Sequence, residues 1–326
     1  MGRAFIPPGL GLARALTFIL CALLTGCATP QLSGLLQQVP TDLPPTAQVL
    51  EVPFFPREDY QCGPASLAMV AQFAGVPVTP EELRPQVFLP ERQGSLQLEM
   101  LAATRRQGLV AWTLAPQLHE LLRQVAVGQP VVVLQNLSLP WAPLWHYAVV
   151  VGYEMPTQTI WLHSGLNERM AMSLRTFERT WARGRHWAML ALPPSRLPAH
   201  AQPLPWLQAA AALERVHPAA AGQAYETAVQ AWPEEPGGWL GLGNALYAQG
   251  RLDDAGLAFE AATALAPDFA DAWNNLAQVR FEQMRWDEAA EAIEQAVRLG
   301  GPRLARYRSL QEQVLMRRPA PAGSPS

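Results

Sequence analysis

The chain has 326 residues, of which 49% are hydrophobic and 16% charged, and its formal net charge is −3. This length exceeds one ordinary domain core and predicts two domains with connecting segments. The small net charge gives no indication of a nucleic-acid partner, and none is predicted.

The N-terminus has the pattern of an export signal. Arg3 and Arg14 supply positive charge, and the apolar run Ala15–Leu24 follows. Ten apolar residues are too few to span a bilayer, which takes about 20 in a helix. The pattern is that of a signal peptide covering residues 1–26.

The run ends in Leu24-Thr25-Gly26-Cys27, which resembles the bacterial lipobox. This resemblance implies that Cys27 is lipidated and becomes the mature N-terminus. Ala28 after it implies sorting to the outer membrane of a Gram-negative cell, facing the periplasm. The alternative is an ordinary signal peptide cut nearby, with Cys27 incidental.

Cysteine usage narrows the chemistry of the mature chain. Cys21 leaves with the signal peptide and Cys27 carries lipid, so Cys62 remains as the free thiol. A disulfide framework and a cysteine-rich metal site are both excluded. No histidine spacing suits zinc, and neither a metal nor a cofactor is predicted.

The next elements mix helices and strands. Residues 27–48 are polar and rich in proline, which predicts a tether. Thr79-Pro80-Glu81-Glu82 has the form of a capping box. Apolar spacing predicts helices at 62–74, 95–107 and 116–127, and β-rich runs predict strands at 130–137, 146–154, 159–163 and 187–192. Helices followed by sheet-forming runs indicate an α+β fold.

The last third is alanine-rich and repeats every 34 residues. Trp239, Phe259 and Pro267 lie at the spacing of a tetratricopeptide repeat, and Trp273 stands one period later. Such repeats resemble modules that bind proteins, so a protein partner is expected. Residues 1–26 are expected to form a signal peptide, 27–48 a tether and 49–194 the α+β domain. Residues 195–205 are expected to form a linker, 206–312 the repeat domain and 313–326 a disordered tail.

Two segments carry the chemistry. Cys62 is expected at the start of a helix, where the helix dipole and free amides favour a thiolate. Gly63 leaves space beside it for a substrate. His146 opens a predicted strand about 84 residues later. A histidine at a strand start facing a thiol at a helix start suits nucleophilic attack, with Cys62 as nucleophile and His146 as base.

The segments QCGPASLAM around Cys62 and WHYAVVVGYE around His146 resemble the bacteriocin-processing, double-glycine-leader cysteine peptidases. The resemblance covers residues 49–194. It implies a papain-like α+β cysteine peptidase domain, followed here by an all-α tetratricopeptide-repeat domain. It also implies cleavage of a peptide or amide bond through an acyl-enzyme.

Two departures from the family pattern concern the helpers of this pair. The family orients its histidine with an aspartate in an Asp-Pro pair, where this chain has Leu162-His163-Ser164-Gly165. Ser164 or Asn167 could orient the imidazole instead. The family places an oxyanion glutamine a few residues before the cysteine, whereas here Gln61 is adjacent to it.

Three functions follow from this pattern. The first is a membrane-anchored cysteine peptidase whose repeats bind a substrate or a protein partner. The second is a peptidase-like binding or assembly module without activity, which the missing Asp-Pro pair favours. The third is a transpeptidase or amidase acting on cell-wall peptides, which would use the same Cys62–His146 pair and is not distinguished from the first by the sequence.

Overall fold

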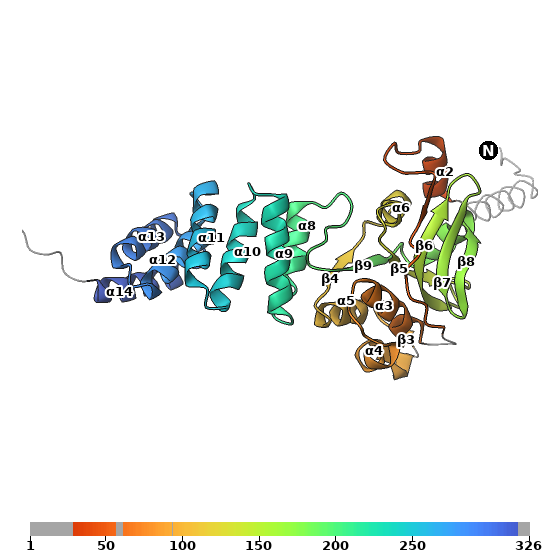
Figure 1. Cartoon of the computed structure of the whole chain (residues 1–326), viewed down its shortest axis with the longest axis horizontal. Helices are drawn as coiled ribbons and strands as arrows, with labels where there is room; N and C mark the ends of the chain where they lie inside the picture. The colour runs from red at the N-terminus through yellow and green to blue at the C-terminus, as the bar shows by residue number, and fades with distance from the viewer. Residues whose placement is uncertain (1–28, 57–60, 93, 319–326) are drawn as a thin grey trace, which may run out of the picture. The chain divides into compact units, whose positions relative to one another are not determined.

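The computed structural model of the chain describes residues 29–56, 61–92 and 94–318 (Figure 1). Cys27 and the signal segment therefore lie outside the described residues. The chain divides into two compact units of three segments each. The first unit comprises Met1–Val70, Phe88–Ser95 and Thr113–Leu190, and the second comprises Ala71–Val87, Leu96–Trp112 and Ala191–Ser326. In the described residues no helix is long and apolar enough to cross a membrane.

The centre of the fold is a seven-stranded sheet with the order β4-β9-β5-β6-β7-β8, in which β1 pairs with the last residues of β6. The strands are β1 (Thr46–Gln48), β4 (Val110–Thr113), β5 (Val131–Asn136), β6 (Trp145–Glu154), β7 (Thr159–Ser164), β8 (Asn167–Ser173) and β9 (Ala188–Leu192). The pairs β5–β6, β6–β7, β7–β8 and β5–β9 are antiparallel. The expected α+β fold is thereby confirmed.

The core forms where apolar strands meet an amphipathic helix. All residues of β5 are buried, as a strand covered on both faces requires. Helix α7 (Leu174–Arg183) begins at its cap Ser173, whose side chain accepts a hydrogen bond from the Thr176 amide. Its buried Phe177 and Trp181 lie four residues apart on one face and stack with ring centroids 5.6 Å apart.

The segment after residue 28 is folded, although its polar composition predicts a tether. Helix α2 (Pro30–Gln37) buries Leu32 and Leu35. The amides of Gln31 and Leu32 donate to the buried Glu178 carboxylate at 3.0 and 2.8 Å. Free amides at a helix start satisfy a carboxylate that burial would otherwise penalise. The apolar pair and this contact explain why the segment packs as a helix.

The second unit contains two short helices, α4 (Pro80–Val87) and α5 (Gln97–Arg106). The expected capping box forms: the Thr79 amide donates to Glu82 Oε2 at 2.8 Å, and the Glu82 amide donates to Thr79 Oγ1 at 3.3 Å. The hairpin β2 (Phe88–Leu89) and β3 (Gly94–Ser95), with the short helix η1 (Pro90–Arg92) between its strands, belongs to the first unit.

The repeat helices stack side by side in Figure 1. They are α8 (Pro203–Ala211), α9 (Pro218–Ala231), α10 (Pro236–Ala248), α11 (Leu252–Leu265), α12 (Ala270–Glu282), α13 (Trp286–Leu299) and α14 (Leu304–Arg317). The Trp239 ring nitrogen donates to Pro233 O at 2.8 Å, and one period later Trp273 donates to Pro267 O at 2.9 Å. The repeated sequence thus produces a repeated hydrogen bond, as stacked copies of one unit require.

Both ends of the repeat helices extend further than the sequence predicts. Helix α8 begins at Pro203, inside the expected linker, and buries Trp206. Helix α14 continues to Arg317, inside the expected tail, because Leu310 and Val314 are four residues apart and buried on one face.

Candidate active site

Cys62 is the first residue of helix α3 (Cys62–Phe73) and is half-buried. The Tyr147 backbone amide donates to its sulfur at 3.4 Å. Tyr147 follows His146 directly at the start of β6. The structure thus brings the helix that carries the thiol against the strand that carries the predicted base.

His146 is half-buried, and its Nε2 lies 2.9 Å from Ser164 Oγ. Ser164 is the last residue of β7 and is buried. Because β6 and β7 are antiparallel neighbours, the start of one strand lies beside the end of the other. The hydroxyl therefore has the position from which a side chain can orient the imidazole.

Asn167 and Gln61 are placed differently. Asn167 opens β8, pairs with Ser164 across the tight turn and is exposed. Among the described residues its side chain makes no hydrogen bond. Gln61 is half-buried, and its backbone oxygen accepts a hydrogen bond from the Ala65 amide at 3.2 Å. The role of Gln61 as an oxyanion donor stays a prediction.

His163 lies next to the site with both ring nitrogens engaged. Its Nε2 donates to Val52 O at 3.2 Å, and its Nδ1 accepts a hydrogen bond from the Arg169 amide at 3.1 Å. This pairing requires a neutral ring. Burial lowers the pKa of His163, against the opposing effect of the hydrogen bond to Val52. The ring therefore holds β7 to its neighbours and is not available as a base.

Tyr147 also belongs to the site, although the sequence marks it only by its place after His146. Its hydroxyl donates to Ser95 O at 3.2 Å, and its ring packs edge-on against Trp187. Burial, followed by the neighbouring Cys62, raises the pKa of Tyr147 above its ordinary value. Its position directly after His146 is the signal that could have identified it.

The thiol borders a cavity of about 10 Å³, which is about the room of one water molecule. Its lining residues are Phe55, Cys62, Ala65, Ser66, Met69, Tyr147, His163 and Gly165. The cavity itself is too small for a substrate side chain.

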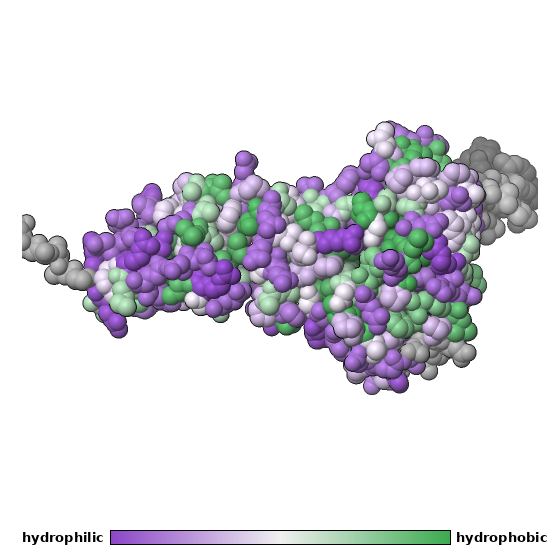
Figure 2. Space-filling view, in the orientation of Figure 1, coloured by the Kyte–Doolittle hydropathy of each residue, from purple (hydrophilic) through white to green (hydrophobic). Residues whose placement is uncertain are grey.

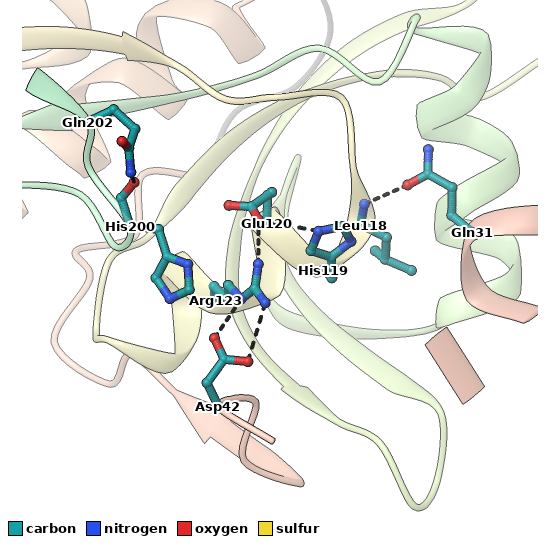
Figure 3. Close-up of polar contacts among 8 residues, drawn as sticks. All are labelled: Gln31, Asp42, Leu118, His119, Glu120, Arg123, His200 and Gln202. Carbon is teal, nitrogen blue, oxygen red and sulfur yellow. Dashed lines mark hydrogen bonds and ion pairs between the residues drawn. The ribbon is translucent and has the colours of Figure 1, made fainter. Parts of the chain in front are cut away.

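A second and larger cleft of about 550 Å³ lies between α2 and helix α6 (Leu118–Ala126). Figure 3 shows its polar contacts: Gln31 Oε1 accepts from the Leu118 amide at 2.5 Å, and Arg123 pairs with Asp42 at 2.7 Å. Arg123 also pairs with Glu120, which lies 3.2 Å from His119. The one guanidinium is shared by two carboxylates, and these contacts hold α6 against the chain before β1.

Groups of three or more metal-binding side chains do not occur in the part of the chain that the structure describes. The side chains gathered around Cys62 and the start of β6 include a thiol, an imidazole and a hydroxyl.

Comparison with known families agrees with this fold. Residues 49–189 match the Peptidase_C39 like family, and residues 243–284 match the TPR repeat. Residues 49–189 are thus similar to C39-like peptidases and residues 243–284 to tetratricopeptide repeats, and the resemblance inferred from the Cys62 and His146 segments is confirmed. No curated protein sequence matches the chain.

Among solved structures, a C39-like peptidase from Bacillus anthracis is 20% identical, with a TM-score of 0.37, and the match covers 44% of this chain and 96% of that one. The repeats are similar to the TPR2B domain of yeast Sti1, solved as a pHsp70 complex, at 17% identity and a TM-score of 0.33, covering 35% and 98%. The Sgt2 TPR domain from Aspergillus fumigatus is 21% identical, with a TM-score of 0.32, covering 38% and 89%.

Proposed function

We propose that the chain is a cysteine peptidase that cleaves a peptide or amide bond through Cys62 and His146. The observation that supports it most is the contact chain at the site. The Tyr147 amide donates to the Cys62 sulfur, Tyr147 follows His146 directly, and Ser164 contacts the His146 ring. These contacts support a nucleophile, a base and an orienting group at one site, which is what acyl transfer uses.

In the proposed reaction the His146 imidazole acts first as a base and then as an acid. Ser164 contacts Nε2 of His146, and in the proposed reaction the imidazole takes the Cys62 proton. The thiolate attacks the carbonyl carbon, the imidazolium donates its proton to the departing amine, and an acyl-enzyme forms. Water, deprotonated by the same ring, then releases the acid and regenerates the thiol.

Ser164 in place of a carboxylate has a definite consequence. A hydroxyl fixes the ring direction but brings no negative charge to stabilise the imidazolium. The pair is therefore expected to work more slowly than one supported by an aspartate. This substitution also supports the second candidate, a binding or assembly module that keeps the fold without turnover.

An acyl-trapping experiment separates the two. The purified chain is incubated with an activated peptide ester and analysed by intact-mass spectrometry. A peptidase gives an acyl adduct on Cys62, absent in Cys62→Ala and formed about 10² to 10⁴ times more slowly in His146→Ala. An unmodified chain after prolonged incubation would leave the binding module as the function. Transfer of the acyl group to added amines, rather than to water, would identify a transpeptidase.

The repeats are proposed to bind the protein partner or the substrate of the peptidase domain. Their α-helical stack is the architecture that other proteins use for protein recognition. We also propose that Cys27 carries the lipid that anchors the chain in the Gram-negative cell envelope, on the periplasmic side of the outer membrane. The apolar run followed by Leu24-Thr25-Gly26-Cys27 supports this location.

A further inference from the structure

Two loops beside the catalytic pair expose large apolar side chains. One joins β5 to β6, and the other is the turn between β7 and β8. Their exposed fractions lie between 40% and 79%. The six residues, called the apolar rim below, are Leu137, Leu139, Trp141, Leu144, Trp145 and Leu166. Figure 2 shows several apolar patches on the visible face of the sheet-containing part, whereas the visible face over α13 and α14 is mostly hydrophilic.

The rim is held in place by one buried side chain. Asn136 Oδ1 accepts hydrogen bonds from the amides of Ser138 and Leu144, at 3.0 and 2.9 Å, on the two sides of the loop. The Leu137 amide donates to Leu144 O at 2.9 Å, which closes the loop base. A loop fixed in this way presents its leucines and tryptophans to solvent as part of its folded form.

The rim adjoins the reacting groups on both sides. Trp145 precedes His146, and Leu166 stands two residues after Ser164. The cavity at Cys62 has room for about one water and is lined in part by Gly165, which adjoins Leu166, so we expect a bound peptide to lie beside the rim. Neither the 137–145 loop nor the 165–166 turn carries a charged residue.

These features favour a peptide over a membrane as the occupant. A bilayer seated on the rim would cover the entrance to Cys62. The rim also lacks the Lys and Arg that attract anionic lipids to interfacial segments. A peptide that reaches Cys62 instead passes the rim on its way.

We infer that the apolar rim binds apolar side chains of the substrate peptide next to the scissile bond, and so selects substrates with leucine-like or aromatic residues there. This inference rests on the proposed peptidase function. Tryptophan is among the side chains that most often dominate binding energy at protein interfaces, and the rim exposes two of them, Trp141 and Trp145.

The test measures binding without turnover. Two fluorescein-labelled peptides of equal length and charge, Lys-Leu-Gln-Leu-Gln-Leu-Lys and Lys-Ser-Gln-Ser-Gln-Ser-Lys, are titrated with the full chain carrying Cys62→Ala. The same titration is made after adding Trp141→Ser. The matched control adds Val127→Ser, an exposed apolar residue at the C-cap of α6. Circular dichroism verifies that each variant is folded.

We expect the leucine peptide to bind about tenfold tighter than the serine peptide, and Trp141→Ser to remove about that factor. Val127→Ser should change neither affinity. Equal affinities for the two peptides, or a Trp141→Ser chain that binds as before, would overturn the inference and place peptide binding elsewhere. If Trp141→Ser abolishes binding to phosphatidylglycerol vesicles and leaves the affinity for both peptides unchanged, the rim binds membranes and the inference is overturned. If the wild-type chain has no peptidase activity but still binds the leucine peptide more tightly in a Trp141-dependent way, the peptidase proposal is contradicted and the peptide-binding role of the rim stands.

Discussion

Ser164 takes the place at which related peptidases carry a carboxylate, and its hydroxyl reaches the His146 ring. One neutral hydrogen bond contributes about 1 kcal/mol, or roughly five- to tenfold in rate. We predict that Ser164→Ala slows acylation of Cys62 by about this factor. Asn167→Ala, on the exposed side of the same turn, should leave the rate unchanged.

Ser164→Asp should have the opposite effect on the acylation rate to Ser164→Ala. A carboxylate beside the imidazole favours its charged form, so acylation at neutral pH should become faster. Stopped-flow measurement with an activated ester checks all three variants. A loss in Asn167→Ala as large as that in Ser164→Ala would show that the amide, not the hydroxyl, orients the ring.

The buried His163 should make the stability of the fold depend on pH. Burial holds its pKa below the ordinary value of about 6.5, so the unfolded chain binds a proton more readily than the folded one. The stabilisation is therefore present above about pH 6.5 and is lost as the pH falls through the lowered pKa. Melting temperatures between pH 8 and about pH 5 should decline less in His163→Gln than in the parent chain. Parallel declines would contradict this assignment.

The sequence predicts Cys62 and His146 as nucleophile and base and leaves open which of Ser164 and Asn167 lies at the imidazole. Cys62 and His146 are each marked by their place at the start of an element, which local patterns reveal. Ser164 and Asn167 lie three residues apart around one turn, and only the pairing of β6 with β7 selects the serine. Register is set by long-range packing, so the sequence left both open.

At the scale of elements, close helix packing in the repeats depends on glycines at helix contacts, of which Gly243 is one. A Cβ on Gly243 in α10 would lie 2.5 Å from the Phe259 ring in α11. We predict that Gly243→Ala destabilises the repeats by about 1–3 kcal/mol, because the ring cannot move without disturbing its own contacts.

Gly222 in α9 is the matched control, since the nearest atom to a Cβ there would be at 3.4 Å, an ordinary contact. Gly222→Ala should be neutral or slightly stabilising, because alanine favours the helix. Urea denaturation followed by circular dichroism compares the two. Equal effects of both substitutions would mean that helix propensity, not contact with Phe259, governs the result.

The sequence predicted apolar strands and regular helices well and missed elements of other kinds. β5 and β6 are continuous apolar runs, whereas β8 (NERMAMS) is polar and half-exposed at the sheet edge. Helix α7 also went unpredicted, although Leu174, Phe177 and Trp181 recur at helical spacing. The edge strand owes its conformation to pairing with β7, which no local pattern records.

At the scale of the whole molecule, the proposed anchor determines where the protein acts. The first described residue, Thr29, is two positions after Cys27, and α2 packs on α7 directly afterwards. We predict that the mature N-terminal peptide begins at Cys27 and carries the mass of lipid, and that Cys27→Ser moves the chain to the soluble fraction. A mature terminus at another residue, without lipid, would contradict this.

The repeats could be predicted because a 34-residue period survives in two consecutive units. The first unit is degenerate: Trp206 is buried, its ring centroid lies 6.2 Å from that of Trp112 in β4, and its ring nitrogen donates to Ala224 O at 2.8 Å. Trp239 and Trp273 instead donate to prolines. Trp206 therefore has contacts that the 34-residue spacing does not predict.

The central claim, that His146 activates Cys62 as a nucleophile, is tested most directly by the rate of Cys62 alkylation with iodoacetamide at about pH 6. An ordinary thiol with a pKa near 8.5 is then less than about 1% ionised. We predict that Cys62 reacts at least about tenfold faster than a model thiol, and that His146→Ala removes this advantage while the fold is kept. A Cys62 that reacts like a model thiol, with no change in His146→Ala, would contradict the account.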